Sequence, residues 1–192
     1  MNNKDRIIPV IAATFIIVAG FVTILDITIG MSLSSEDMPN SALDYFNIFS
    51  ESNFIGLYYL DFLNFLNVFF ILVYVILLLI ITWEKSKKLT FTTFILSISG
   101  SILFVINNGS LKMLNLSNQY FSTDSSNLMA VYLNEAEIIL ENSSHGSVSV
   151  FYGYFILSIA NVLLALILFR TGLIKKSISI LGLIGYGMLS LY

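Results

Sequence analysis

The basic residues of this sequence lie in three short clusters, and each cluster adjoins a long apolar run. Apart from Lys112, every Lys and Arg belongs to one of these clusters: Lys4/Arg6, Lys85/Lys87/Lys88 and Arg170/Lys175/Lys176. Lys and Arg beside the ends of membrane spans stay on the cytoplasmic side, because they resist translocation. The pattern therefore predicts a multi-pass chain that crosses a bilayer several times, with all three clusters on the cytoplasmic side.

The composition points to the same class of protein. Hydrophobic residues make up 57% of the chain and charged residues 11%, whereas a soluble domain carries about 25% charged residues. These charges are too few to cover a globule in water, so lipid must supply part of the solvent. The net charge of −3, with no basic stripe outside the clusters, argues against nucleic acid as a partner.

Five apolar segments approach the roughly 20 residues that cross a hydrocarbon core of ~30 Å. They are residues 7–29, 54–83, 89–111, 150–169 and 177–192. The second is too long for one perpendicular crossing, so we expect it to tilt or to begin in the headgroup layer. The last covers about 24 Å and has no charge after it, which predicts that a longer natural protein continues beyond it. We expect an all-α fold, a polytopic membrane helical bundle of five transmembrane helices in one domain over residues 1–192.

The connecting segments predict the orientation of this bundle. Residues 31–53 and 113–149 contain no Lys or Arg, whereas the hairpin turns 84–88 and 170–176 are basic. By the positive-inside rule, both long loops lie outside, and the N-terminus and both turns are cytoplasmic.

The second long loop contains an amphipathic segment at residues 127–141. Apolar side chains recur there at steps of three and four residues, which is typical of one helical face. Asn134, Glu137 and Glu141 gather on the opposite face. The segment is too short to span, so we predict an interfacial helix that lies on the outer membrane surface or caps the bundle. The alternative is a lid over a binding site.

Polar side chains within the apolar segments gather in the outer half of the predicted bundle. The candidate residues are Asp61, Asn64, Asn67, Asn107, Lys112 and Asn161. Because intramembrane polar groups usually face protein or water, they predict an outward-facing polar cavity in which Lys112 neutralises Asp61 or Asp26. Alternatively, the charged groups lie at headgroup level and the Asn side chains form interhelical hydrogen bonds. Further contributors on the outer face are Asp26, Glu135 and His145.

Residues that common catalytic and metal sites need are scarce. The chain has no Cys, and His145 is its only His, which excludes thiolate sites, cysteine nucleophiles and the common multi-His metal sites. No G-x-S-x-G elbow accompanies His145, and Asp26 and Asp61 are the sole candidates for a carboxylate pair. We therefore predict no catalytic residue, no metal and no cofactor.

The last third of the chain contains a recognisable order of features. His145 precedes a Phe-Tyr-Gly at 151–153, a turn Phe-Arg-Thr-Gly-Leu-Ile-Lys-Lys at 169–176 and a glycine-containing span at 181–186. This order resembles an uncharacterised bacterial multi-span membrane protein family catalogued only as a domain of unknown function, most clearly over residues 145–190. The third span lacks the Arg and Glu often seen in that family, and its closing sixth span is absent. The resemblance implies a fold and a location in the bacterial cytoplasmic (inner) membrane, the plasma membrane of the cell. It implies no activity.

These patterns predict a non-enzymatic membrane protein. In this hypothesis the partners are the lipid bilayer and a lipid, an apolar small molecule or a membrane protein, bound through the outer-leaflet half. The alternative is a small transporter or transporter subunit that uses the polar cavity around Asp61. An intramembrane enzyme is the third hypothesis.

Overall fold

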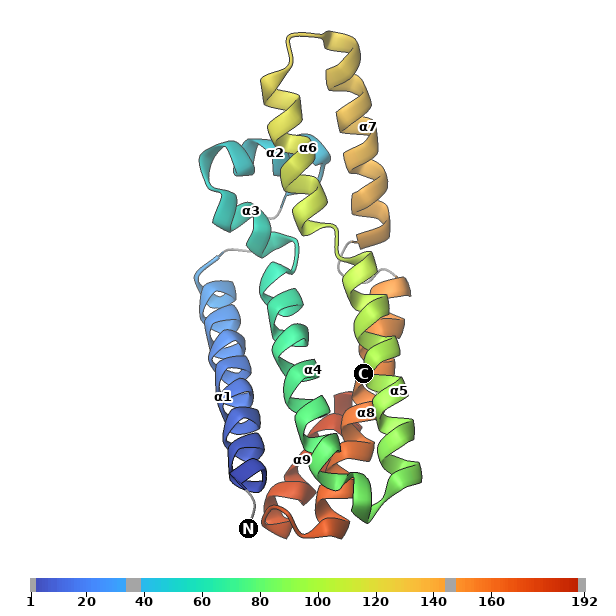
Figure 1. Ribbon diagram of the computed structural model, residues 1–192. Helices are drawn as coiled ribbons and strands as arrows, with labels where there is room; N and C mark the ends of the chain where they lie inside the picture. The colour runs from blue at the N-terminus through green and yellow to red at the C-terminus, as the bar shows by residue number, and fades with distance from the viewer. Residues whose placement is uncertain (1–2, 34–38, 144–147, 190–192) are drawn as a thin grey trace.

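The computed structural model describes residues 3–33, 39–143 and 148–189, and all regular structure in these ranges is helical (Figure 1). The predicted all-α class is therefore confirmed for the described residues. The helices form an elongated molecule with two layers stacked along its long axis (Figure 1).

One layer consists of the long apolar helices and one shorter helix. These are α1 (Asn3–Ser32), α4 (Phe62–Thr82), α5 (Lys87–Asn107), α8 (Val148–Thr171) and α9 (Lys176–Leu189). A short 3-10 turn, η2 (Trp83–Lys85), joins α4 to α5.

The other layer, which we call the cap, contains the shorter and more polar helices. These are α2 (Ala42–Glu51), α3 (Asn53–Tyr59), α6 (Ser110–Ser122) and α7 (Ser126–Ser143). The cap lies at one end of the molecule, and the turns α4–α5 and α8–α9 lie at the opposite end (Figure 1).

Four described helical stretches are long and apolar enough to cross a membrane. They are Ile7–Ser32, Phe62–Lys85, Lys87–Ser122 and Phe151–Thr171. α9 has 14 described residues and covers about 21 Å, which is less than a core of ~30 Å. The fifth predicted span therefore stays a prediction. The four stretches are those of a multi-span membrane protein.

The apolar segment at 54–83 is not one continuous helix. α3 ends at Tyr59 and α4 begins at Phe62, and Asp61 between them has a left-handed backbone with a φ of 61°. A left-handed residue interrupts an α-helix, so the part before Asp61 turns away and joins the cap. The predicted segment 54–83 is too long for one perpendicular crossing. α4 alone is shorter, with 21 residues that cover about 31 Å.

The third apolar segment is interrupted in the same way. α5 ends at Asn107, and α6 begins at Ser110 after a break at Asn108 and Gly109. α5 also has 21 residues, so α4 and α5 have equal lengths that match the thickness of a hydrocarbon core.

α2 begins at a capping box. The Ser41 hydroxyl accepts a hydrogen bond from the Asp44 backbone N–H at 3.2 Å, and the Asp44 carboxylate accepts one from the Ser41 N–H at 3.0 Å. These bonds satisfy backbone donors that have no partner within the helix. They also lower the pKa of Asp44, chiefly through the Ser41 hydroxyl.

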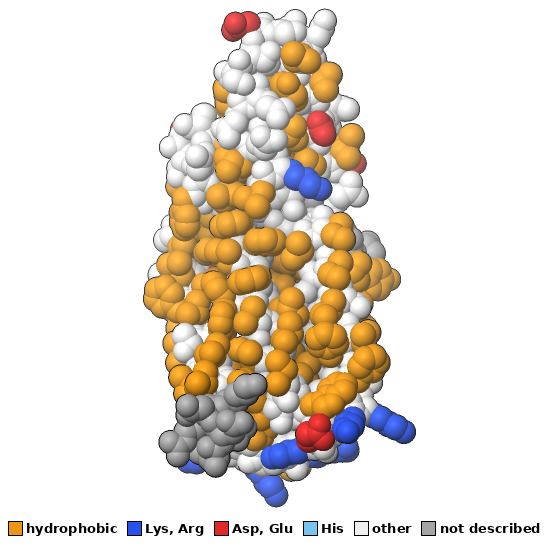
Figure 2. Space-filling model, viewed as in Figure 1, with side chains coloured by type: hydrophobic (Ala, Val, Ile, Leu, Met, Phe, Trp, Pro, Cys, Tyr) orange, Lys and Arg blue, Asp and Glu red, His pale blue; other side chains and the backbone are white. Residues whose placement is uncertain are grey.

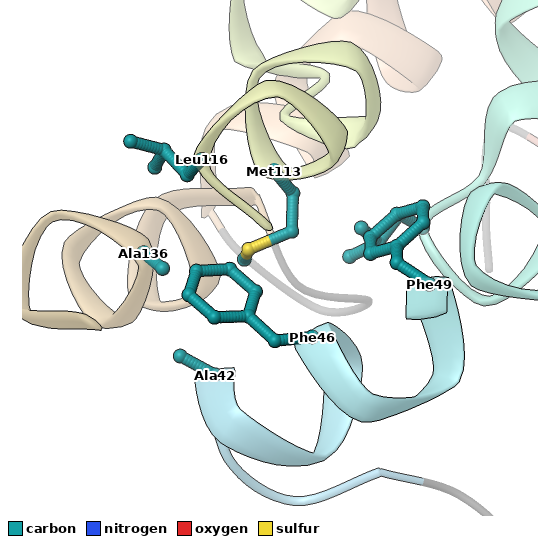
Figure 3. Close-up of a cluster of buried hydrophobic side chains, with 7 residues drawn as sticks. Ala42, Phe46, Phe49, Met113, Leu116 and Ala136 are labelled. Atoms are coloured by element: carbon teal, nitrogen blue, oxygen red, sulfur yellow. The ribbon is translucent and has the colours of Figure 1, made fainter. Parts of the chain in front are cut away.

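α6 and α7 form an antiparallel hairpin that stands along the long axis of the molecule (Figure 1). α7 covers the amphipathic segment expected at 127–141, but it is upright instead of lying across the end of the bundle. Its Ala136 is buried in the core of the cap against Phe46 and Met113 (Figure 3). The apolar face of α7 is therefore engaged by α2 and α6.

Small residues allow the closest helix approach in the long-helix layer. A Cβ atom on Gly100 of α5 would lie 3.1 Å from the backbone oxygen of Gly153 on α8. A Cβ on Gly153 would lie 3.1 Å from the backbone nitrogen of Phe104. α5 and α8 thus pack backbone to backbone, as small residues permit in membrane helices. α1 packs along α4, and α9 packs along α8.

Candidate functional site

A polar junction joins the cap to the long helices at the two helix breaks. The Asn64 amide donates to the Asp61 carboxylate at 3.2 Å. The Asn108 amide donates to the backbone oxygens of Leu60 and Asp61, both at 3.4 Å. The Asn108 side-chain oxygen accepts hydrogen bonds from the backbone N–H and the hydroxyl of Ser110. These bonds connect the break before α4 with the break before α6.

Asn108 carries this connection, although the candidates taken from the sequence include its neighbour Asn107. The Asn107 amide donates to the Leu103 oxygen of its own helix at 2.7 Å. The Asn-Gly pair at 108–109 is a turn signal and could have indicated that Asn108 ends the helix and faces the junction.

The acids of the junction lie close to tyrosines of the cap. The Tyr58 hydroxyl donates to the Asp26 backbone oxygen at 3.2 Å. Burial, followed by the charges of Asp26 and Asp61, raises the pKa of Tyr58. Burial together with the charge of Asp61 raises the pKa of Tyr45 to about 12. The junction is therefore a negatively charged layer beneath neutral tyrosines.

The structure does not bring the six predicted cavity residues together. The Asn67 amide donates a hydrogen bond to the Thr23 hydroxyl at 2.9 Å and so links α4 to α1. This is the interhelical hydrogen bond that the sequence offers as the alternative to a polar cavity. Lys112 is exposed on α6, in the cap. Asn161 lines a different cavity, described below, and Glu135 is exposed on α7. His145, which we predict to contribute to the outer face, lies outside the described residues.

The most enclosed of the cavities described here lies between α1, α4, α8 and α9. Its volume is about 590 Å³, and its lining is mainly aliphatic. The wall comes from Pro9–Ile16 of α1, Tyr74–Ile81 of α4, Asn161–Leu168 of α8 and Ile178–Tyr186 of α9. Since α1 packs on α4 and α9 packs on α8, the cavity occupies the space between two helix pairs.

A few polar side chains line this apolar wall. Asn161 is 7% exposed and Tyr74 is 4% exposed. Ser179 is 1% exposed, and its hydroxyl has no hydrogen-bond partner among the described residues. An apolar pocket with a small number of placed polar groups is the usual form of a small-molecule site.

The cavity lies in the half of the long-helix layer that is farther from the cap. It extends to Leu173 and Ile174, in the turn between α8 and α9, and this turn is at the end opposite the cap (Figure 1). From the sequence we predict a polar cavity in the half nearer the cap and aliphatic packing in the half farther from it. The lining is indeed apolar, but small residues such as Ala12, Ala13 and Gly182 leave space between the helix pairs.

Two other hollows are more open. One, of about 470 Å³, lies on the cap between Phe49, Glu51, Asn118 and Phe121. The other, of about 420 Å³, lies beside Trp83 between α4 and α5. Among the described residues, no group of three or more His, Cys, Asp or Glu side chains could hold a metal ion.

The fold and the cavity define the class of this protein as a multi-span α-helical membrane protein with a helical cap at one end. Comparison with protein-family models, with curated proteins and with solved structures gives no significant match. The family resemblance over residues 145–190 therefore stays a prediction.

Proposed function

We propose that this protein is a non-enzymatic membrane protein that binds a lipid or another apolar small molecule in the cavity between α1, α4, α8 and α9. The volume of about 590 Å³ falls within the roughly 300–1,000 Å³ of ligand pockets. This volume, combined with the mainly aliphatic wall, is the observation that carries the proposal.

Exposed side chains on the rim supply an entrance for such a molecule. Ile16 of α1 and Ile178 and Leu181 of α9 line the cavity and are also exposed on the outside of the molecule. In a bilayer, exposed aliphatic side chains at this level face hydrocarbon. An apolar molecule can therefore enter from the membrane between α1 and α9 without crossing water.

This proposal keeps the ligand class predicted from the sequence but places the site in the other half of the bundle. The polar residues that suggested the outer half take part in structural contacts: Asn67 bonds to α1, and Asn64 bonds to Asp61. The cavity for an apolar ligand lies where the polar side chains are few.

The test is photolabelling of the whole protein in phospholipid vesicles with a fatty acid that carries a diazirine on its chain. We expect labelled peptides from residues 9–16 and 178–186. Ala13→Phe fills the cavity, so labelling there should fall severalfold. Ile17→Phe, on the exposed side of α1 and outside the cavity lining, is the matched control and should leave labelling unchanged. Labelling spread evenly over lipid-exposed helices, and unaffected by Ala13→Phe, would contradict the proposal.

A second candidate, transport, is favoured by the geometry at Asp61. Asp61 is a charged residue with a left-handed backbone at a helix break, and non-glycine residues held in this backbone conformation cluster at functional sites. Transport predicts that Asp61→Asn abolishes substrate-dependent ion or solute movement in proteoliposomes. Unchanged movement in the variant would exclude a role of the Asp61 charge in transport.

A further inference from the structure

Basic side chains flank the mouth of the cavity. Leu173 and Ile174 line it, and they lie between Arg170 and Lys175 in the turn that joins α8 to α9. Both basic side chains are exposed. Figure 2 shows Lys and Arg gathered at this end of the molecule, below a surface that is mainly hydrophobic. An apolar cavity therefore opens beside a positively charged rim.

The turn holds this basic rim in a defined place. Gly172 has a φ of +65°, a left-handed conformation that glycine adopts readily at the end of a helix. Lys176 lies over the ring of Phe169, with its Nζ 5.6 Å from the ring centroid, which is a cation–π distance. This contact ties the start of α9 to the end of α8, so Arg170 and Lys175 stay beside Leu173 and Ile174.

The depth of the cavity matches one leaflet of a bilayer. Its lining runs over seven residue steps of α8, from Asn161 to Leu168, and eight steps of α9, from Ile178 to Tyr186. At the rise of an α-helix these steps correspond to about 10 to 12 Å. One leaflet contributes roughly 15 Å of a ~30 Å hydrocarbon core. A chain that enters at the basic end therefore extends through most of its own leaflet.

A buried polar group lies at the level where a lipid chain joins its headgroup. Ser179 is three residues into α9 after Lys176, which is about 4 to 5 Å along the axis. Ser179 is one of the residues that line the cavity and is 1% exposed, and its buried hydroxyl has no hydrogen-bond partner among the described residues. A buried hydroxyl without a partner is costly, and the carbonyl oxygen of an acyl chain would accept its hydrogen bond.

We propose that the cavity binds one chain of an anionic lipid from the leaflet on the basic side of the membrane. The anionic headgroup lies at Arg170 and Lys175, the acyl carbonyl accepts a hydrogen bond from Ser179, and the chain extends toward Asn161. By the positive-inside rule this leaflet is the cytoplasmic one. The inference rests on the proposed function and adds to it the charge, the leaflet and the orientation of the ligand.

The experiment uses a tryptophan at the rim of the cavity as a reporter. Trp83 is the only Trp of the chain, so the variant Trp83→Phe/Leu181→Trp has a single indole beside the cavity. It is reconstituted in phosphatidylcholine vesicles that contain a fixed minor fraction of either phosphatidylglycerol or phosphatidylcholine with brominated chains. Bromine quenches the indole only when the chain is in contact with it. Quenching is measured for both lipids at equal fractions.

We expect an apparent association constant about fivefold higher for brominated phosphatidylglycerol, as one basic side chain near a membrane surface can provide. Arg170→Gln/Lys175→Gln should abolish this preference. Lys85→Gln/Lys88→Gln removes the same charge from the other basic turn and should preserve it. Ser179→Ala should weaken quenching by both lipids, since both carry acyl carbonyls.

The other possible outcomes distinguish a failure of the anion selectivity from a failure of chain binding in the cavity. If both lipids quench equally and Ala13→Phe reduces the quenching, the cavity takes a chain but does not select an anion, which overturns this inference and leaves the proposed function standing. If Ala13→Phe changes nothing for either lipid, no chain enters the cavity, and the proposed function fails as well. If both pairs of charge variants reduce the preference equally, the selectivity belongs to the whole basic surface, which also overturns the inference.

Discussion

The Asn108 side-chain amide donates a hydrogen bond to the backbone oxygen of Asp61 at 3.4 Å, across the two helix breaks. Asp61 is the residue before α4, and Asn108 is the residue after α5. Helix ends leave backbone groups without intrahelical partners. The Asn108 side chain bonds to the Leu60 oxygen at the end of α3 and to the Ser110 N–H at the start of α6. The cap is therefore joined to the long helices by polar contacts at one level, in addition to its covalent connections.

Asn108→Ala should loosen this junction. It removes the bonds to Leu60 and Asp61 and those to Ser110, and a lost buried hydrogen bond costs about 1 kcal/mol or somewhat more. Hydrogen exchange of the first turn of α6 in detergent micelles should accelerate. Asn107→Ala is the control, because its amide bonds only within its own helix. Equal acceleration in both variants would show that Asn108 does not connect the two breaks.

Asp61→Gly should be more stable than Asp61→Ala by about 1 to 2 kcal/mol, since the left-handed conformation costs this much for a residue with a Cβ. Both variants lose the bond to Asn64, so their difference reports the backbone alone. The measurement is the free energy of unfolding in detergent with increasing denaturant. Equal stabilities would mean that residue 61 does not keep a positive φ.

Phe46→Ala should destabilise the cap while the long helices remain folded. Phe46 is fully buried, with its ring centroid 5.2 Å from that of Tyr120, and Phe-to-Ala changes in cores cost about 3 to 5 kcal/mol. Protection from hydrogen exchange should fall in α2, α6 and α7 and persist in α4 and α5. Phe121→Ala, at a side chain that is 51% exposed, should leave the cap protected. Loss of protection in all helices would show that cap and bundle fold as one unit.

Tyr45 should titrate later than a free tyrosine. Its folded-state pKa of about 12 exceeds the ordinary value of 10.0, so the neutral hydroxyl is favoured by the fold. The contribution to stability is complete below pH 10 and is lost as the pH rises from about 10 to about 12. The absorbance of tyrosinate, compared between the protein and Tyr45→Phe, measures this titration. Asp61→Asn should move the Tyr45 pKa downward, because it removes the nearby charge.

Most of the apolar helices could be located from the sequence, although α4 begins at Phe62 where the sequence predicts residue 54. α8 covers Val148–Thr171 where the sequence predicts 150–169, and α5 begins at Lys87 where it predicts residue 89. Hydrophobic length and the absence of charge are local properties, so they are readable without knowledge of packing. The arrangement of basic turns at one end and long loops at the other follows from the same property.

The breaks and the cap could be predicted only in part. Asp61 adopts a left-handed backbone without a glycine or proline to indicate it, and its contact with Asn108 is defined by the tertiary fold. The periodicity of residues 127–141 predicts a two-faced helix, but whether that face meets lipid or protein depends on α2 and α6. Ala136 is buried because Phe46 and Met113 cover it.

Membrane class, helix positions and the clustering of basic residues were determined by the sequence itself, because they depend on composition within single segments. The location of the cavity was decided by tertiary structure alone. Its walls come from α1, α4 and the consecutive helices α8 and α9, which are three separate parts of the chain. Its space results from small residues, Ala12 on α1 and Gly182 on α9, that face it from different helix pairs. No pattern within a single segment predicts this cavity, because it forms only in the space that the two helix pairs leave between them.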